Sequence, residues 1–223
     1  MITHNHVKTD AQIQQDVLRE LAWDTRVDPT EIGVEVKGGI VTLTGVVASW
    51  AKKLAAEEAA HRVSGVLDVA NDVIVHVEGS EVPTDAEIAT AVRNALRWDV
   101  FVPDDRIQST VANGVVTLTG DVETFAQRED AERAVTNLAG VRLVFNEIAV
   151  ASMEVTPDKL RDAIHAALER HADRDAERLQ LDIEGGRVTL HGSVHSWRER
   201  EAIVGAVTGT RGVETVVDRL RLA

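Results

Sequence analysis

Cysteine is absent from the 223 residues of this sequence, which excludes a disulfide framework, a thiolate nucleophile and a cysteine-based metal site. No apolar run approaches the roughly 20 residues that span a bilayer, and the first residues lack the basic and apolar regions of a secretory signal. These absences predict a cytoplasmic protein, or a periplasmic one if a leader has been removed.

Motifs that carry catalysis are absent as well. The sequence contains no G-x-S-x-G elbow, no H-E-x-x-H pair and no acidic calcium-binding loop of the D-x-[DN]-x-[DN]-G type. Carboxylates are plentiful, but nothing singles out one pair among them. We therefore expect a protein that is not an enzyme and that holds neither a cofactor nor a metal.

Positive charge is scarce, because 24 Lys and Arg residues stand against 37 Asp and Glu residues, for a net charge of -13. A field of this sign repels nucleic-acid phosphates and anionic lipid headgroups, so we expect no nucleic-acid partner. The last third of the chain is nearly balanced and is the part best suited to an anionic surface. Its candidates for a local basic patch are Arg198, Arg200 and Arg211.

The sequence also contains an internal repeat. The phrase GGIVTLTG (38–45) returns as NGVVTLTG (113–120) and as GGRVTLHG (185–192). An aromatic residue stands five positions after each closing glycine, and a Gly-Val pair twenty positions after it. The closing glycines are Gly45, Gly120 and Gly192, and the aromatics are Trp50, Phe125 and Trp197. Because three landmarks keep their spacing, the chain consists of three copies of one unit.

Each copy opens with an amphipathic helix. In the first copy Ile13, Val17 and Leu21 recur at helical spacing. Its start, Thr9 followed three residues later by Gln12, has the pattern of a capping box. The second copy repeats this box at Thr84 and Glu87, and the third places Pro157 at the first helical position. These helices are predicted to end near Trp23, Trp98 and Arg170.

A hairpin follows each helix. The two-residue turns predict positive φ at both positions, and they are Gly38-Gly39, Asn113-Gly114 and Gly185-Gly186. The phrase is therefore a hairpin rather than a phosphate cradle, since its first glycines stand between two strands. In its V-T-L segment, Val41 and Leu43 fall on one face and Thr42 on the other, so one face is buried and the other is wet or covered by something else.

A second helix and a third strand complete the unit. The predicted N-caps of this helix are Ser49, Thr124 and Ser196, with capping boxes at Thr124–Gln127 and Ser196–Glu199. The predicted C-terminal glycines are Gly65, Gly140 and Gly212. We therefore predict an α+β protein of three tandem small α-β-β-α-β modules, each with two helices on a three-stranded mixed sheet. The predicted modules span 8–78, 83–151 and 155–223.

This order of elements, with its G-G or N-G turn, V-T-L-x-G strand and Gly-Val pair, resembles the BON (bacterial OsmY and nodulation) domain family. The resemblance covers almost the whole chain as three tandem copies. It implies a non-enzymatic module associated with osmotic and envelope stress, phospholipid attachment and small-cation binding. The hallmark glycine of the family corresponds to Gly45, Gly120 and Gly192.

The repeated aromatics are the main candidates for a binding site. At the start of a helix, Trp50, Phe125 and Trp197 suit core packing or a contact with a neighbouring unit, and they also suit insertion into lipid or a partner. The histidine pair His191 and His195 occurs in the third copy alone, straddles a glycine and is an improbable metal site. His4 and His6 fit a loose terminus better than a ligand pair.

Three hypotheses of function follow. The first is a cytoplasmic, acidic, non-enzymatic stress-associated protein that attaches to membrane phospholipid or to a protein partner. The second is a cytoplasmic sensor of potassium or of divalent cations, suggested by the net charge and by the family. The third is a structural protein that self-associates, with exposed third-strand edges pairing between chains.

Overall fold

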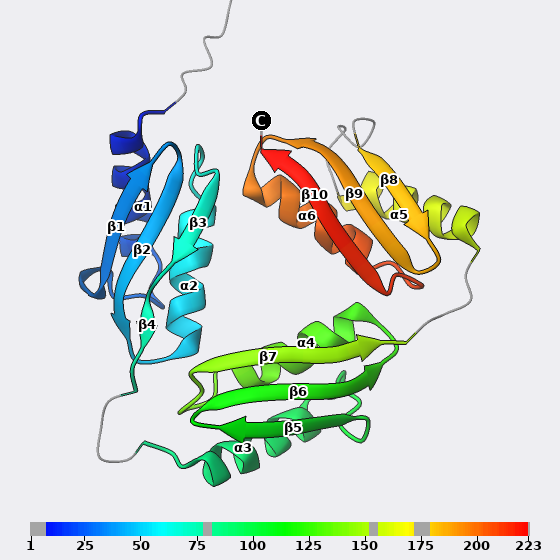
Figure 1. Cartoon of the computed structure of the whole chain (residues 1–223), viewed down its shortest axis with the longest axis horizontal. Helices are drawn as coiled ribbons and strands as arrows, with labels where there is room; N and C mark the ends of the chain where they lie inside the picture. Colours follow the sequence, from blue (N-terminus) through cyan, green and yellow to red (C-terminus); the bar gives the residue numbers. More distant parts are fainter. Residues whose placement is uncertain (1–7, 78–81, 152–155, 172–178, 223) are drawn as a thin grey trace, which may run out of the picture. The chain divides into compact units, whose positions relative to one another are not determined.

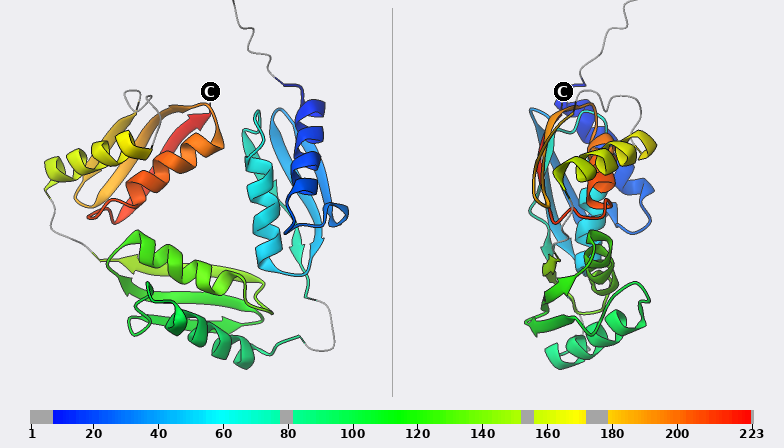
Figure 2. Two further views of the ribbon diagram at one scale, coloured as in Figure 1. Left: turned by 180° about the vertical axis from the view of Figure 1, so that it is seen from behind. Right: turned by 90° about the vertical axis from the view of Figure 1, so that its right-hand side faces the viewer.

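The computed structural model describes residues 8–77, 82–151, 156–171 and 179–222 (Figure 1). The chain divides into two compact units, Met1–Val82 and Pro83–Ala223. The first holds one module and the second holds two, which we call modules 1, 2 and 3. Each is a sheet with two helices on one face (Figure 2), which confirms the predicted fold class. The predicted boundaries between modules lie in or directly beside residues 78–81 and 152–155, which are outside the described ranges, so those boundaries stay predictions.

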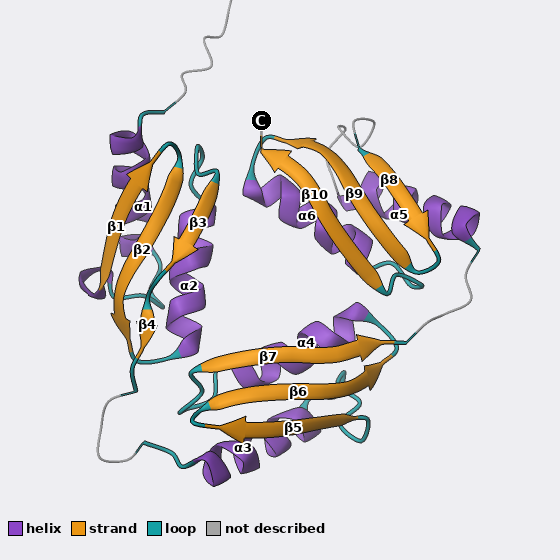
Figure 3. Cartoon of the chain, viewed as in Figure 1, coloured by secondary structure: helices purple, strands orange, loops and turns teal. Residues whose placement is uncertain are grey.

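Module 1 has the predicted order of elements, with a third strand that is split in two (Figure 3). Strand β2 pairs antiparallel with β1 and parallel with both β3 and β4. The elements are α1 Asp10–Trp23, the short 3-10 helix η1 Pro29–Glu31, β1 Ile32–Lys37, β2 Ile40–Val47, α2 Trp50–His61, β3 Asp68–Asn71 and β4 Ile74–Val75.

Modules 2 and 3 repeat this topology with an unbroken third strand of eight residues. In each, the central strand pairs antiparallel with the first and parallel with the third. Module 2 comprises α3 Asp85–Trp98, β5 Ile107–Ala112, β6 Val115–Val122, α4 Phe125–Thr136 and β7 Leu143–Val150. Module 3 comprises α5 Pro157–His171, β8 Gln180–Glu184, β9 Arg187–Val194, α6 Trp197–Thr208 and β10 Thr215–Leu222.

The core of each module lies between the sheet and its two helices. The V-T-L segment supplies its centre, because the valine and leucine of every copy have no exposed surface. These residues are Val41, Leu43, Val116, Leu118, Val188 and Leu190. Burying such a side chain contributes about 1.5–3 kcal/mol relative to exposure. The alternating threonines point to the other face of the sheet, which no helix of the same module covers.

The closing glycine of the phrase is a structural requirement in modules 1 and 2. Gly45 has φ of +133° and Gly120 has φ of +130°, in a region that side chains rarely adopt. A Cβ atom on Gly45 would lie 2.0 Å from the carbonyl oxygen of Glu31, and one on Gly120 would lie 2.2 Å from that of Arg106. The glycine therefore permits the backbone of the central strand to meet the residue that precedes the first strand.

Two of the three hairpin turns have the predicted geometry. Both residues of Gly38-Gly39 and of Asn113-Gly114 have positive φ. A carboxylate explains the stability of these turns, since Asp10 accepts the N–H groups of Gly38 and Gly39 at 2.8 and 3.0 Å. These two hydrogen bonds hold the pKa of Asp10 below its ordinary value. In module 2, Asp85 accepts the two turn N–H groups in the same way, at 2.8 and 2.9 Å.

The prediction was wrong for the third turn. Gly185 has φ of +60°, but Gly186 lies outside the left-handed region. The helix supplies the reason, because Pro157 follows Thr156 where Asp10 follows Thr9 and Asp85 follows Thr84. Proline offers no carboxylate to draw the two N–H groups together.

The helix ends also differ in part from the prediction. The second helices end at His61, Thr136 and Thr208, before the glycines predicted to end them. Gly65, Gly140 and Gly212 instead occupy the third position of a following turn, with φ of +96°, +84° and +97°. In the first of these turns the N–H of Val66 donates to the carbonyl of Val63. A turn with positive φ at its third position favours glycine there. This requirement explains why glycine recurs at these three positions.

The capping boxes of α1 and α3 are confirmed. Those predicted for α4 and α6 are wrong in one of their two hydrogen bonds, the one from the N-cap backbone N–H. Thr124 accepts the N–H of Gln127 as expected, but the Gln127 side chain accepts from Glu123 instead of Thr124. Glu199 likewise accepts from His195. The N-cap φ explains the difference, since it is -142° and -158° at these helices and -74° and -68° at the two true boxes. This rotation points the N-cap N–H in another direction.

We predict that Gly45→Ala unfolds module 1 or destabilises it by at least about 3 kcal/mol, because the new Cβ would overlap a backbone oxygen. Gly38→Ala is the matched control, since Gly38 also has positive φ but no atom lies within 4 Å of the added Cβ. Its cost is expected to be about 1–2 kcal/mol. Urea unfolding of the full chain measures both, with hydrogen exchange assigning the transition of residues 8–77. Equal effects of the two substitutions would contradict the steric argument.

Candidate functional site

The predicted aromatics stand at the first residue of α2, α4 and α6, and all three are half-buried. Each ring lies beside a cation from three residues further along the same helix. Lys53 Nζ lies 5.8 Å from the Trp50 ring centre. The guanidinium carbons of Arg128 and Arg200 lie 5.8 and 4.4 Å from the rings of Phe125 and Trp197. Each ring therefore already has a contact in its own module, and binding of lipid or a partner by these residues stays a prediction.

The residues that carry these cations also contact an Asn or Asp that recurs in every third strand, through a guanidinium in modules 2 and 3 and through the backbone carbonyl of Lys53 in module 1, a link that sequence reasoning missed. Arg128 donates to the carbonyl of Asn146 at 2.9 Å, and Arg200 donates to the carboxylate of Asp218 at 2.7 Å. In module 1, Asn71 donates to the carbonyl of Lys53 at 3.1 Å. Asn71, Asn146 and Asp218 follow the spacing of the closing glycines, which was the available signal.

These Asn and Asp side chains also engage the third strand itself. The Oδ1 atom accepts the backbone N–H two residues further on, at 3.3 Å for Asn71 to Val73 and for Asn146 to Ile148. Asp218 does the same for Leu220 at 2.8 Å. An N–H group bound in this way is not available to an incoming strand, so the third-strand edges are less open than the sequence suggests.

The most exposed aromatics are others, at the ends of the first helices. Trp23 and Trp98 end α1 and α3 at equivalent positions, and each is 83% exposed. Module 2 adds Val100 at 88% and Phe101 at 70% to the same end. We call Trp98, Val100 and Phe101 the aromatic tip. The residue at this position in module 3 is Arg170, whose side chain lies outside the description.

The loop that carries the aromatic tip is held by hydrogen bonds. Asp99 accepts the N–H of Phe101 at 3.0 Å. Arg93 reaches from α3 to the carbonyls of Asp104 and Ile107, at 3.0 and 3.2 Å. Between the exposed residues and this anchor, Val102 is buried. The tip is thus an apolar surface presented on a fixed loop rather than a stretch of loose chain.

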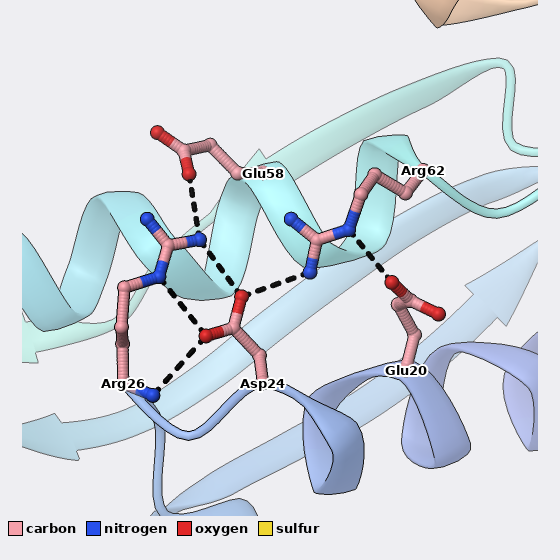
Figure 4. A network of polar contacts seen from close by, with 5 residues as sticks. All are labelled: Glu20, Asp24, Arg26, Glu58 and Arg62. Atoms are coloured by element: carbon pink, nitrogen blue, oxygen red, sulfur yellow. Dashed lines mark hydrogen bonds and ion pairs between the residues drawn. The ribbon is translucent and has the colours of Figure 1, made fainter.

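Module 1 has a network of ion pairs at the same place (Figure 4). Asp24, with a side chain only 7% exposed, accepts from Arg26 at 2.8 and 3.0 Å and from Arg62 at 2.8 Å. Arg62 also pairs with Glu20 at 2.6 Å, and Arg26 pairs with Glu58 at 2.8 Å. The network joins the end of α1 and its following loop to α2.

This network lowers the pKa of its central carboxylate, and module 2 carries different residues at the positions of the two arginines. The hydrogen bond from Arg26, supported by Arg62, holds the pKa of Asp24 well below its ordinary value against the opposing effect of burial. At the position of Arg26, module 2 carries Phe101 of the aromatic tip, and at the position of Arg62 it carries Asn137. The two modules therefore present one exposed tryptophan each, beside charges in module 1 and beside apolar side chains in module 2.

The predicted basic patch of module 3 is not assembled as expected. Arg200 is bound to Asp218, whereas Arg198 and Arg211 are exposed and have no ion-pair partner among the described residues. The histidines His191 and His195 also make different contacts. His191 Nε2 lies 3.3 Å from a carboxylate oxygen of Asp182, and the backbone N–H of His195 donates to Glu199. His4 and His6 lie outside the described residues.

Neither a metal site nor a membrane span emerges from the described ranges. Within them, no three His, Asp or Glu side chains gather in a group that could hold a metal ion. None of the helices described combines the length and apolar character that a bilayer crossing requires.

Comparison with known proteins identifies the module. The family model described as the BON domain matches three times, at residues 9–76, 84–152 and 157–223. The chain belongs to the BON domain family. The resemblance stated from the sequence is thereby confirmed over nearly the whole chain.

Individual proteins are also similar to this chain. Osmotically-inducible protein Y of Escherichia coli (strain K12) is 31% identical over 143 residues, which cover 62% of this chain and 71% of that protein. An uncharacterized protein in the gshII 5' region of Anaplasma centrale is 32% identical over 118 residues, covering 50% of this chain and 78% of that one. Among solved structures, CdsD, a structural protein of the type III secretion system of Chlamydia trachomatis, is similar at 14% identity and a TM-score of 0.27. That match covers 94% of this chain and 91% of CdsD.

We predict that Asp24→Asn destabilises module 1 by about 1.5–3 kcal/mol at neutral pH, because two arginines lose their shared carboxylate. Since the folded-state pKa of Asp24 lies below its ordinary value of about 3.9, this stabilisation is complete above that value. It is lost as the pH falls through the folded-state pKa. Urea unfolding between neutral and acidic pH measures the difference between the two proteins.

The control is Asp99→Asn, at the equivalent position of module 2. Asp99 accepts only a backbone N–H among the described residues, so the expected loss is about 0.5–1.5 kcal/mol. The free energy of unfolding of the native protein should approach that of Asp24→Asn far below pH ~4. If the difference between the two keeps its full size there, the assigned role of the carboxylate charge is contradicted.

Proposed function

We propose that this protein is a non-enzymatic binding protein that attaches to a membrane surface through the aromatic tip of module 2, assisted by Trp23 of module 1. The observation that carries the proposal is the exposure of Trp98, Val100 and Phe101 on one anchored loop. Large apolar side chains on a fixed loop are costly in water unless they meet an apolar surface. Tryptophan suits the headgroup region of a bilayer in particular, because its ring is apolar and its N–H is polar.

The net charge of -13 determines which membrane suits this tip. An anionic surface repels the chain as a whole, and the repulsion weakens as salt shortens the Debye length. Attachment through aromatic side chains needs no opposite charge. We therefore propose zwitterionic lipid as the better surface, and anionic lipid only at raised ionic strength.

The biological setting is proposed from the family. A relative in Escherichia coli is named as an osmotically inducible protein, and we extend an association with osmotic stress to this chain on that ground. The cytoplasm, predicted from the sequence, is kept as the proposed location. The half-buried Trp50, Phe125 and Trp197 are kept as a second, alternative contact set for lipid or for a protein partner, which applies only if the aromatic tip is not the contact. The cation hypothesis stays an alternative proposal, although no group of three or more His, Asp or Glu among the described residues could hold a metal ion.

We predict that the double substitution Trp98→Ala with Phe101→Ala lowers partition onto phosphatidylcholine vesicles by at least about tenfold. The reason is that two aromatic side chains no longer bury their surface in the lipid. Vesicle flotation measures partition, and a variant that keeps Trp98 as its only tryptophan should shift its emission to the blue on binding. The control is Trp50→Ala, which removes a half-buried ring from module 1 and should leave partition within about twofold.

The outcomes separate the proposed surfaces. Loss of partition with Trp50→Ala or Trp197→Ala, but not with the tip variant, would transfer the contact to the second set. If the native protein floats with neither zwitterionic nor anionic vesicles at any salt concentration, the membrane proposal is wrong and a protein partner takes its place.

A further inference from the structure

The open faces of the sheets, opposite the helices, have a charge pattern that the proposed function does not use. In β10 the side chain of Leu220 is in the core and that of Asp218 binds α6, so the alternating Arg219 and Arg221 lie on the open face. In β7 the core residue is Ile148, so Glu147 and Ala149 lie on the open face.

Equivalent positions on these faces carry opposite charges. Arg219 of module 3 stands where module 2 has Glu147 and module 1 has Asp72. Among the described residues, neither Arg219, Arg221 nor Glu147 has an ion-pair partner within 4 Å. An arginine without a partner in a chain of net charge -13 is free to meet an external carboxylate, and Glu147 is free to supply one.

Neighbouring strands extend both faces. By register, Arg219 lies beside His191 and Arg221 beside Ser193. The two arginines of β10 therefore have polar neighbours on β9. His191 itself lies near Asp182 of β8, and Arg187, which alternates with the buried Val188 at the start of β9, adds a third arginine to this face. On module 2, Phe145 lies beside Thr117 and is 50% exposed, which gives that face an apolar centre next to Glu147.

Edge pairing is a poorer route to association than face packing. Each third strand has one N–H bound by its own Asn or Asp side chain, as described for Val73, Ile148 and Leu220. Module 1 also has a third strand split into two short pieces. The open faces have no such protection.

We infer that the open sheet face of module 3 packs on the open sheet face of module 2 in a second copy of this chain, with Arg219 and Arg221 against Glu147 and with Phe145 between the sheets. The two faces differ, so the contact is heterologous, and a dimer formed through one such contact retains one unused face of each kind, which can close on each other or bind further chains. Assemblies larger than dimers follow at high concentration. This inference is independent of the proposed function, because the aromatic tip is at the end of a helix and not on the open face.

The area of the contact sets its strength. Three strands about 4.8 Å apart, of which the two longer ones have eight residues at about 3.3 Å per residue, give a face of at most about 14 by 26 Å. This area is roughly half of the ~800 Å² that each partner buries in a standard interface. The association is therefore reversible, weak and dependent on the charges.

Sedimentation velocity of the full chain without lipid tests the inference. In about 0.1 M salt, where the Debye length is about 10 Å and the repulsion between two chains of net charge -13 is screened, the mean mass should rise with protein concentration. In about 1 M salt, where it is about 3 Å, the protein should be monomeric. In the lower of these salt concentrations, a monomer at every protein concentration would overturn the inference and would leave the vesicle result untouched.

Charge reversal tests the pairing itself. Arg219→Glu and Glu147→Arg should each weaken association by at least about tenfold, because like charges then face each other. An equimolar mixture of the two variants should associate again, since each presents the charge that the other needs. The matched control is Arg198→Glu, which makes the same charge change at an exposed site on α6 and should leave association within about twofold.

Two results would contradict the pairing. One is an equal loss from Arg198→Glu and Arg219→Glu, which would assign association to net charge alone. The other is a mixture of Arg219→Glu and Glu147→Arg that stays monomeric although both variants melt like the native protein.

Discussion

In modules 1 and 2, the backbone of a central-strand glycine meets the carbonyl of the residue that precedes the first strand. At Gly45 and Gly120 this approach leaves no room for a Cβ atom. The contact fixes how the two strands of the hairpin lie, and with it the face on which Val41, Leu43 and their counterparts become the core. Because the sheet must bury that one face, both helices must lie on it, and the other face stays open. The exposed surfaces discussed above all depend on this division.

Within that shared frame, the modules differ at the same positions rather than in their folds. At the end of the first helix, module 1 has an ion-pair network around Asp24, and module 2 has Phe101 where module 1 has Arg26. On the open face, Glu147 of module 2 corresponds to Arg219 of module 3. Three copies of one scaffold can therefore present three surfaces, and a contact made by one module does not carry over to its neighbours.

Sequence patterns predicted the features that depend on neighbours along the chain. The box of Thr9 and Gln12 joins residues three apart, so spacing alone reveals it. The contact of Asp10 with Gly38 joins residues 28 apart, and it becomes visible only when helix and hairpin are folded together. That contact explains why the third turn, with Pro157 in place of the aspartate, departed from the prediction. Trp50, Phe125 and Trp197 recur at one position of the repeat, but such recurrence reflects shared packing as readily as shared function.

The aromatic tip could have been found from helical geometry. Ile88, Val92 and Leu96 form the buried stripe of α3, and Trp98 follows Leu96 by two positions, about 200° round the helix. An apolar residue that far from the stripe faces water unless something else covers it. The charge reversal between Glu147 and Arg219 was equally visible once the copies were aligned, but its meaning required the face on which each side chain lies.

The two proposed contacts respond to salt in opposite directions. Packing of one open face on another depends on arginine and glutamate charges, which added salt screens. Approach to an anionic bilayer is opposed by the net charge, and the same screening removes that opposition. Assembly also raises the number of aromatic tips that one particle presents, and a second tip then binds at an effective concentration set by the assembly rather than by the solution. Ionic strength, the quantity that osmotic stress changes, therefore acts on both contacts at once.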